Sequence, residues 1–108
     1  MANSVEKKKW TIMTYMAGDN NLDQNGAEDI EEMKQTGSTA EIQVIVQFDR
    51  AGAGQQTKRY YLKKGTSLDD DAVQSVGETK TGNPDALIDF ICWGVTNYPT
   101  KHNCLCRL

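Results

Sequence analysis

The most reactive side chains near the end of the chain alternate along it. His102, Cys104 and Cys106 are each separated by one residue, so on a β-strand all three would point to the same face. Cysteine nucleophiles are paired with an imidazole that accepts their proton, and imidazole together with thiolates is also a common zinc ligand set. The pattern therefore raises two possibilities, a catalytic dyad and a metal site.

Other features of the sequence argue against both. A structural zinc site usually has four ligands, and no fourth is evident near this stretch. A histidine that precedes its strand belongs at the amino edge of a parallel sheet, whereas ligands bind beyond the carboxyl edge. We therefore expect no metal site, and we interpret Cys104 and Cys106 as thiols that face the core. Together with Cys92 they make an odd number of cysteines, which favours a reducing compartment or unpaired buried thiols over a closed disulfide set.

A second group of polar side chains follows a buried strand. Trp10–Met16 is mostly apolar and uncharged, which is typical of a strand covered on both faces. Gly18–Asn21 then forms a polar turn, and such turns lie in the crevice where open α/β sheets bind ligands. The turn is either part of a site, through Asp19 and Asn20, or a simple connection in which Asn21 caps the next helix.

A helix and a second strand follow this turn. Ile30 and Met33 belong to the apolar side of the predicted helix, and Gly37 supplies its stop. Glu41–Asp49 is the second strand. A strand, a crossover helix and a strand make a right-handed unit with parallel strands, so Asp49 is expected at the same sheet edge as the polar turn.

The middle of the chain predicts less regular structure. Thr57–Lys63 is a polar strand, expected at the sheet edge or as an antiparallel addition. Gly65–Gly82 carries the run Asp69–Asp71 but lacks the alternating ligands and distal glutamate of a calcium loop. We expect this segment to be a solvated loop.

The second helix begins with Asn83 and Pro84, a cap and a residue suited to the first helical position. Its apolar residues recur as one stripe expected to face the core, made of Leu87, Ile88, Ile91, Val95 and Tyr98 and widened by Phe90 and Trp93. Cys92 lies near this stripe, so we expect it to be buried. Lys101–Leu108 follows as a third parallel strand.

Three stretches in this order, WTIMTYMAGDNNLD, GAEDIEEM and VIVQFDR, resemble the start of the clostripain-type cysteine peptidases, which share the caspase-like fold. The likeness runs from about Lys8 to His102. It implies a basic leader at residues 1–9 and the N-terminal part of a caspase-like domain at residues 10–108. The expected fold is α/β with three layers and a mostly parallel sheet, in the order second strand, first strand, third strand.

The resemblance also implies a function. Members of this family cleave after Arg or Lys, with a catalytic histidine after the third strand and a cysteine after the fourth. Neither position matches a residue of this chain, so no catalytic residue is assigned and the chain alone is expected to be inactive. Asp19 and Asn20 match the family's turn, and they are expected to shape the substrate cleft or to bind the basic side chain of a peptide or protein substrate.

Alternatives from other classes remain. The ending NCLCRL is less apolar than the family's strand, which favours a non-enzymatic α/β interaction module or a frameshifted remnant. A receiver-like domain would use Asp19 and Asp49 for Mg²⁺, but it requires further acids and a lysine that are not evident. A sheet edge left uncovered predicts a homodimer or a larger assembly.

Charge and composition exclude several partners. The formal net charge is -3, and Lys7–Lys9 is too short a basic run for a nucleic-acid site. The chain has no long apolar stretch for a membrane span and no signal peptide as given. We expect no cofactor, and the sequence leaves the compartment undetermined.

Overall fold

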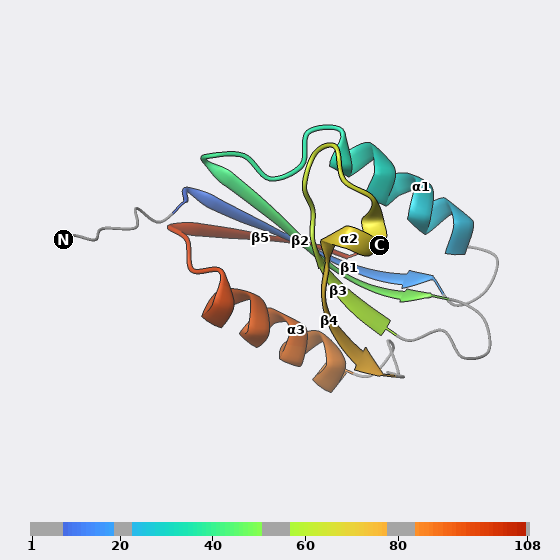
Figure 1. Cartoon of the computed structure of the whole chain (residues 1–108). Helices are drawn as coiled ribbons and strands as arrows, with labels where there is room; N and C mark the ends of the chain where they lie inside the picture. Colours follow the sequence, from blue (N-terminus) through green and yellow to red (C-terminus); the bar gives the residue numbers. More distant parts are fainter. Residues whose placement is uncertain (1–7, 19–22, 51–56, 78–83, 108) are drawn as a thin grey trace.

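The computed structural model describes residues 8–18, 23–50, 57–77 and 84–107. These residues form a five-stranded mixed sheet with a long helix on each face and a short helix near one edge (Figure 1). The strands are β1 (Trp10–Gly18), β2 (Ile42–Arg50), β3 (Thr57–Tyr61), β4 (Ala72–Gly77) and β5 (His102–Arg107). The helices are α1 (Asp23–Lys34), α2 (Leu68–Asp71) and α3 (Pro84–Asn97).

The strand order is β4-β3-β2-β1-β5, with β1 parallel to both β2 and β5. The predicted order of the three parallel strands is therefore confirmed, and β1 lies inside the sheet. Strands β3 and β4 add antiparallel pairs beyond β2. The antiparallel prediction for β3 is correct, but β3 is not an edge strand because β4 pairs with its outer side.

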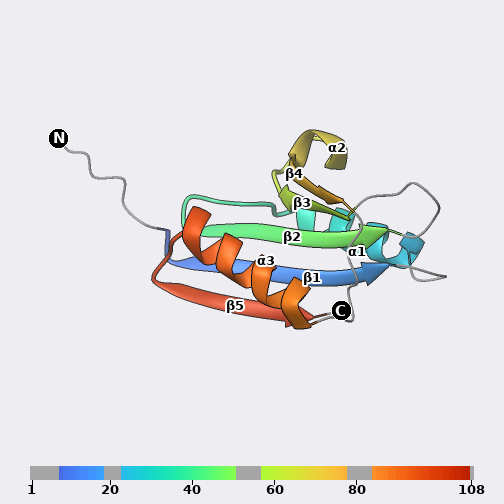
Figure 2. The same cartoon turned by 90° about the horizontal axis from the view of Figure 1, so that it is seen from below.

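Two apolar clusters form the core, one on each face of the sheet. On the α1 face the buried side chains are Met16, Ile30, Val46, Phe48, Tyr60 and Leu62. On the α3 face they are Met13, Tyr15, Ile45 and Phe90. Because side chains alternate along a strand, neighbouring residues of β1 serve both clusters. This explains the nearly continuous apolar sequence of β1 and gives the expected three layers (Figure 2).

Helix α1 ends as the sequence predicts. Gly37 has a φ of +65°, and its N–H donates to the carbonyl of Met33 at 3.0 Å. A Cβ at Gly37 would lie 2.6 Å from the backbone nitrogen of Lys64, so glycine is required here for both conformation and space. The predicted cap, Asn21, lies outside the described residues.

The prediction of a solvated loop over Gly65–Gly82 is wrong for its described part, which contains α2 and β4. Ser67 caps α2 and accepts a hydrogen bond from the backbone N–H of Asp70 at 3.2 Å. Strand β4 pairs with β3 through an irregular register. The segment lacks a period because its helix has only four residues and its strand is interrupted by register shifts.

The buried face of α3 agrees with the predicted stripe in part, since Leu87, Ile91 and Tyr98 pack against the core cluster on this face. Phe90 and Gly94 are buried, whereas Ile88 and Val95 are 56% and 44% exposed and Cys92 is exposed. A Cβ at Gly94 would lie 2.8 Å from both the Ile45 Cδ1 and the Met13 Sδ atoms. Helix α3 therefore approaches the sheet along its smallest residue, which turns the two aliphatic side chains outward. Among the described helices, none has the length and apolarity of a membrane span.

Candidate functional site

The carboxyl ends of the parallel strands meet at one edge of the sheet, where the arrowheads of β1 and β2 lie side by side (Figure 2). The last residue of β1, Gly18, pairs with Arg50, and Ala17 pairs with Asp49. Asp49 is half-buried. The predicted site residues Asp19 and Asn20 lie outside the described residues. Both residues follow Gly18 directly in the sequence. The carboxyl edge of β1 and β2 is therefore the edge at which the sequence predicts the site.

A buried arginine organises the α3 face of the sheet. The Arg59 guanidinium donates to Gln47 Oε1 at 2.8 Å, to Gln74 Oε1 at 3.1 Å and to Asp89 Oδ2 at 2.6 Å. Its side chain is 4% exposed, and its guanidinium carbon lies 4.9 Å from the centre of the Trp93 ring. These contacts join β2, β3, β4 and α3. Sequence reasoning missed this residue because its partners come from three other elements.

His102 lies at the opposite edge, at the first residue of β5. It is exposed, and its ring lies 4.8 Å from the ring of Trp10, with which it also pairs in register. The amino-edge position expected from the sequence is thus confirmed. An exposed imidazole at this edge is not placed to serve a substrate bound beyond the carboxyl ends of the strands.

The three cysteines are free thiols. Cys104 and Cys106 are partly exposed rather than core-facing, and Cys92 is exposed, so the prediction of buried thiols is wrong. Burial and the neighbouring Cys104 thiol raise the pKa of Cys106 above its ordinary value. In the described ranges, no three His, Cys, Asp or Glu residues are grouped closely enough to hold a metal ion.

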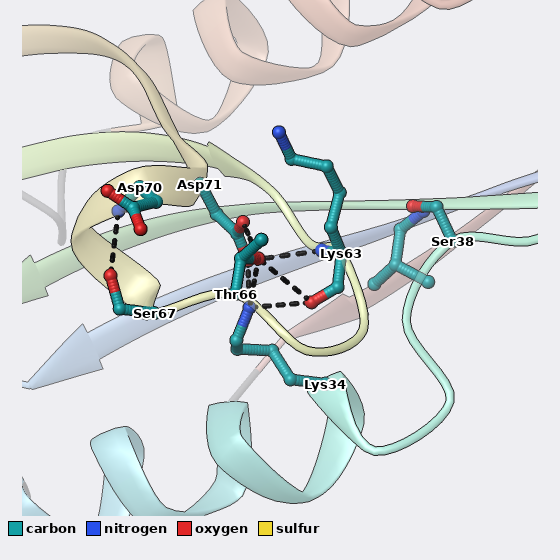
Figure 3. A network of polar contacts seen from close by, with 8 residues as sticks. Lys34, Ser38, Lys63, Thr66, Ser67, Asp70 and Asp71 are labelled. Carbon is teal, nitrogen blue, oxygen red and sulfur yellow. Dashed lines mark hydrogen bonds and ion pairs between the residues drawn. The ribbon is translucent and has the colours of Figure 1, made fainter.

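A buried ion pair connects α1 with α2 (Figure 3). The Lys34 ammonium contacts the Asp71 carboxylate and donates to the Lys63 carbonyl at 2.7 Å and to Thr66 Oγ1 at 3.3 Å. Asp71 accepts further hydrogen bonds from the Lys63 N–H at 3.1 Å and from the Thr66 hydroxyl. Every side-chain donor and acceptor of this ion pair is thus engaged, as buried charges require.

The environment of Asp71 favours its charged form. Burial by itself would raise the pKa of this carboxyl, but hydrogen bonds from Lys34, Thr66 and the Lys63 backbone outweigh that effect and lower it. The sequence carried one missed signal for this region. Ser67 followed three residues later by Asp70 is a capping pattern, which marks the helix start just before Asp71.

A surface hollow of about 430 Å³ lies between β4 and α3, away from the carboxyl edge. It is lined by Val73, Gln74, Trp93, Asn97 and Tyr98. Asn97 and Tyr98 lie where α3 ends, just before the chain enters β5 at the amino edge.

The central parallel strand, the crossover helices on both faces and the antiparallel addition define an α/β domain of the caspase-like class. A family model described as the Clostripain family, Peptidase C11, matches residues 14–106. The chain therefore belongs to the clostripain family, and the resemblance predicted from its sequence is confirmed.

Solved structures share the fold at low sequence identity. A cysteine protease from B. fragilis superposes with a TM-score of 0.71 and 17% identity over 92% of this chain and 86% of its own. A clostripain from Bacteroides thetaiotaomicron in complex with the peptide inhibitor BTN-VLTK-AOMK gives 0.77 and 11%, over 95% and 90%. A secreted C11 cysteine protease from B. thetaiotaomicron, bound to an irreversible peptide inhibitor, gives 0.74 and 20% over 93% of this chain. No curated protein matches the chain significantly.

The solved chains differ in the share of their own length that this chain covers. The chain spans most of the first two solved chains but only 29% of the third. The same unit of fold thus occurs both as a chain of similar length and as a minor part of a much longer one.

Proposed function

We propose that this chain forms the N-terminal part of a clostripain-type cysteine endopeptidase domain that cleaves after Arg or Lys. The observation that carries the proposal is the place of β1 between the parallel strands β2 and β5, with its last residues Ala17 and Gly18 paired with Asp49 and Arg50 at the carboxyl edge. In open α/β sheets this is the place where substrates bind. Membership of the clostripain family supports peptide hydrolysis as the reaction.

In this proposal the chain shapes the cleft but does not supply the nucleophile. A cysteine peptidase needs a thiolate, an imidazole within hydrogen-bond reach and donors for the oxyanion. The only histidine, His102, lies at the amino edge with its ring 4.8 Å from that of Trp10. Cys104 pairs with Ile12 and so lies within the length of β5 rather than at its carboxyl end. We therefore expect no hydrolysis by this chain alone.

Asp19 and Asn20 are proposed to recognise the basic side chain before the cleaved bond. A carboxylate in a partly desolvated cleft forms a charge-assisted hydrogen bond with a guanidinium or ammonium group. The inhibitor bound to the B. thetaiotaomicron clostripain contains the sequence VLTK, and its terminal lysine is consistent with this preference.

The test is hydrolysis of arginyl and lysyl fluorogenic peptides by the chain alone and by the chain mixed with a polypeptide that supplies a clostripain histidine and cysteine. We expect turnover only in the mixture. Asp19→Asn should raise KM for both peptides, whereas the control Asp69→Asn, at an exposed position of α2, should leave KM unchanged. Turnover by the chain alone would overturn the proposal that this chain shapes the cleft without supplying the nucleophile. Equal KM values for the two variants would overturn the role of Asp19.

We also infer a second candidate function, association of two copies through β5. Within the described residues β5 is the outermost strand on its side of the sheet, and Leu105 on it is 42% exposed. Ile88 and Val95 of α3 add exposed apolar surface. An unpaired edge strand offers its backbone groups to another chain, and antiparallel pairing of β5 with β5 would give the two-fold symmetry that most dimers have.

A further inference from the structure

Cys104 and Cys106 form a pair of neighbouring thiols on one face of β5, here called the thiol pair. They align with Ile12 and Thr14 of β1, and the Thr14 hydroxyl contacts the Met33 Sδ atom of α1 at 3.9 Å. The thiol pair therefore lies on the α1 face of the sheet. Side chains two residues apart on a strand point the same way, and neither thiol takes part in a disulfide.

The thiol pair is accessible because no described helix packs closely on this face of β5. Helix α1 packs on β1, farther inside the sheet, and α3 covers the other face (Figure 1). Both cysteines consequently keep part of their surface in solvent. The two sulfur atoms are held side by side by the strand and can be reached from outside.

A disulfide does not suit this spacing. Residues two apart on a strand have Cα atoms separated by about 6.5 Å, which is at the long end of the range that a disulfide allows. A metal ion needs less distortion. With sulfur–metal bonds of about 2.3 Å, one ion bridges sulfur atoms up to about 4.6 Å apart, a much longer span than the roughly 2 Å of a sulfur–sulfur bond.

We propose that the thiol pair binds one Cu(I) ion. Soft thiolate and thioether ligands select Cu(I), and the thioether of Met33 is on the same face. Zinc prefers four ligands, and the described residues offer no group of three. On binding, Cys104 and Cys106 each lose a proton and each form one sulfur–copper bond, so Cu⁺ and two thiols give a bis-thiolate complex of charge -1 and two protons.

The test is an anaerobic titration of the reduced chain with Cu(I) in competition with the chromophoric chelator bicinchoninate. We expect transfer of one Cu(I) per chain. Cys104→Ser and Cys106→Ser should each weaken the affinity by more than the 10–100-fold that loss of an outer-shell partner costs. The matched control Cys92→Ser removes the exposed thiol of α3 and should leave the affinity unchanged.

Several outcomes would overturn the proposal: copper that stays with the chelator, serine variants of the thiol pair that keep the wild-type affinity, or loss of binding in the Cys92 variant. Thermal unfolding separates binding from folding. Cu(I) should raise Tm for the wild type and for Cys92→Ser but not for the other two variants, because a ligand of the folded state stabilises it. Mild oxidation that joins Cys104 to Cys106 in a disulfide would contradict the geometry.

Discussion

Lys34 of α1 and Asp71 of α2 form an ion pair whose side chains are only 4% and 0% exposed. The pair connects the helix that follows the polar turn with the segment that leads into β4 (Figure 3). A buried ion pair adds little stability over an apolar pair of equal volume, but loss of one partner leaves an uncompensated charge. The two residues are therefore strongly interdependent.

Lys34→Met should lower the free energy of unfolding by about 3–5 kcal/mol, because the Asp71 carboxylate would stay buried without its cation. Urea denaturation followed by circular dichroism measures the change. The control is Lys9→Met, which removes an exposed ion pair with Glu41, where the side chains are 59% and 67% exposed. It should cost less than about 1 kcal/mol. Similar losses of unfolding free energy in the two variants would show that the buried pair contributes no more to stability than the exposed one.

The stability of the protein should fall in acid in a way that depends on Asp71. The pKa of this carboxyl is lowered from its ordinary value of 3.8 in the folded state, so the unfolded chain takes up the proton first as the pH decreases. The stabilisation is fully present above 3.8 and is lost as the pH falls through the lower folded pKa. Asp71→Asn should flatten this part of the curve of unfolding free energy against pH. An unchanged slope in the variant would rule out Asp71 as its source.

Gly94→Ala should destabilise the fold by about 1–3 kcal/mol, the usual cost of overpacking a core, because the added methyl group would lie 2.8 Å from Ile45 Cδ1 and Met13 Sδ. Thermal or urea unfolding measures the loss. Ile45→Val removes the Cδ1 atom, so the double variant should lose less than the sum of the two single losses. Simple additivity would contradict the close approach of α3 to the sheet.

Self-association through β5 should be concentration-dependent and should disappear in Leu105→Lys, because charged side chains on an edge strand disfavour pairing. Sedimentation velocity measures the assembly. Val73→Lys is the matched control, since Val73 is 50% exposed on β4 at the other edge of the sheet. A wild-type monomer at all concentrations would refute the association, and loss of assembly in the Val73 variant would assign it to the other edge.

Much of the sheet could be predicted because its signals are local. The uncharged run of β1 and the apolar centre of β2 predict strands, and the intervening helix forces them to be parallel. The same reasoning places Asp49 at the carboxyl edge and His102 at the amino edge, as the structure has them. The roles of Asp19 and Asn20, which lie outside the described residues, stay predictions.

Helix α3 shows where periodicity fails. The spacing predicts burial of Ile88 and Val95, but both are exposed, whereas Phe90, which widens the predicted stripe, is buried beside Gly94. An apolar residue gains from burial on any face that packs, so a helix rich in apolar residues does not specify its rotation. The shape of the sheet beneath, at Met13 and Ile45, selects the glycine side.

By itself, the sequence determined the strands β1 and β2 and their parallel arrangement, because a period of apolar residues and the hand of a crossover depend on neighbours in the chain. It also carried the resemblance that implied the family and the order of the parallel strands. Only the tertiary structure decided that Asp71 is buried against Lys34, 37 residues away. The same holds for Cys104 and Cys106, which are partly exposed to solvent rather than buried in the core. Burial of a polar side chain depends on which distant partner reaches it and on which helix covers its face. Neither is a property of the residue's own surroundings in sequence.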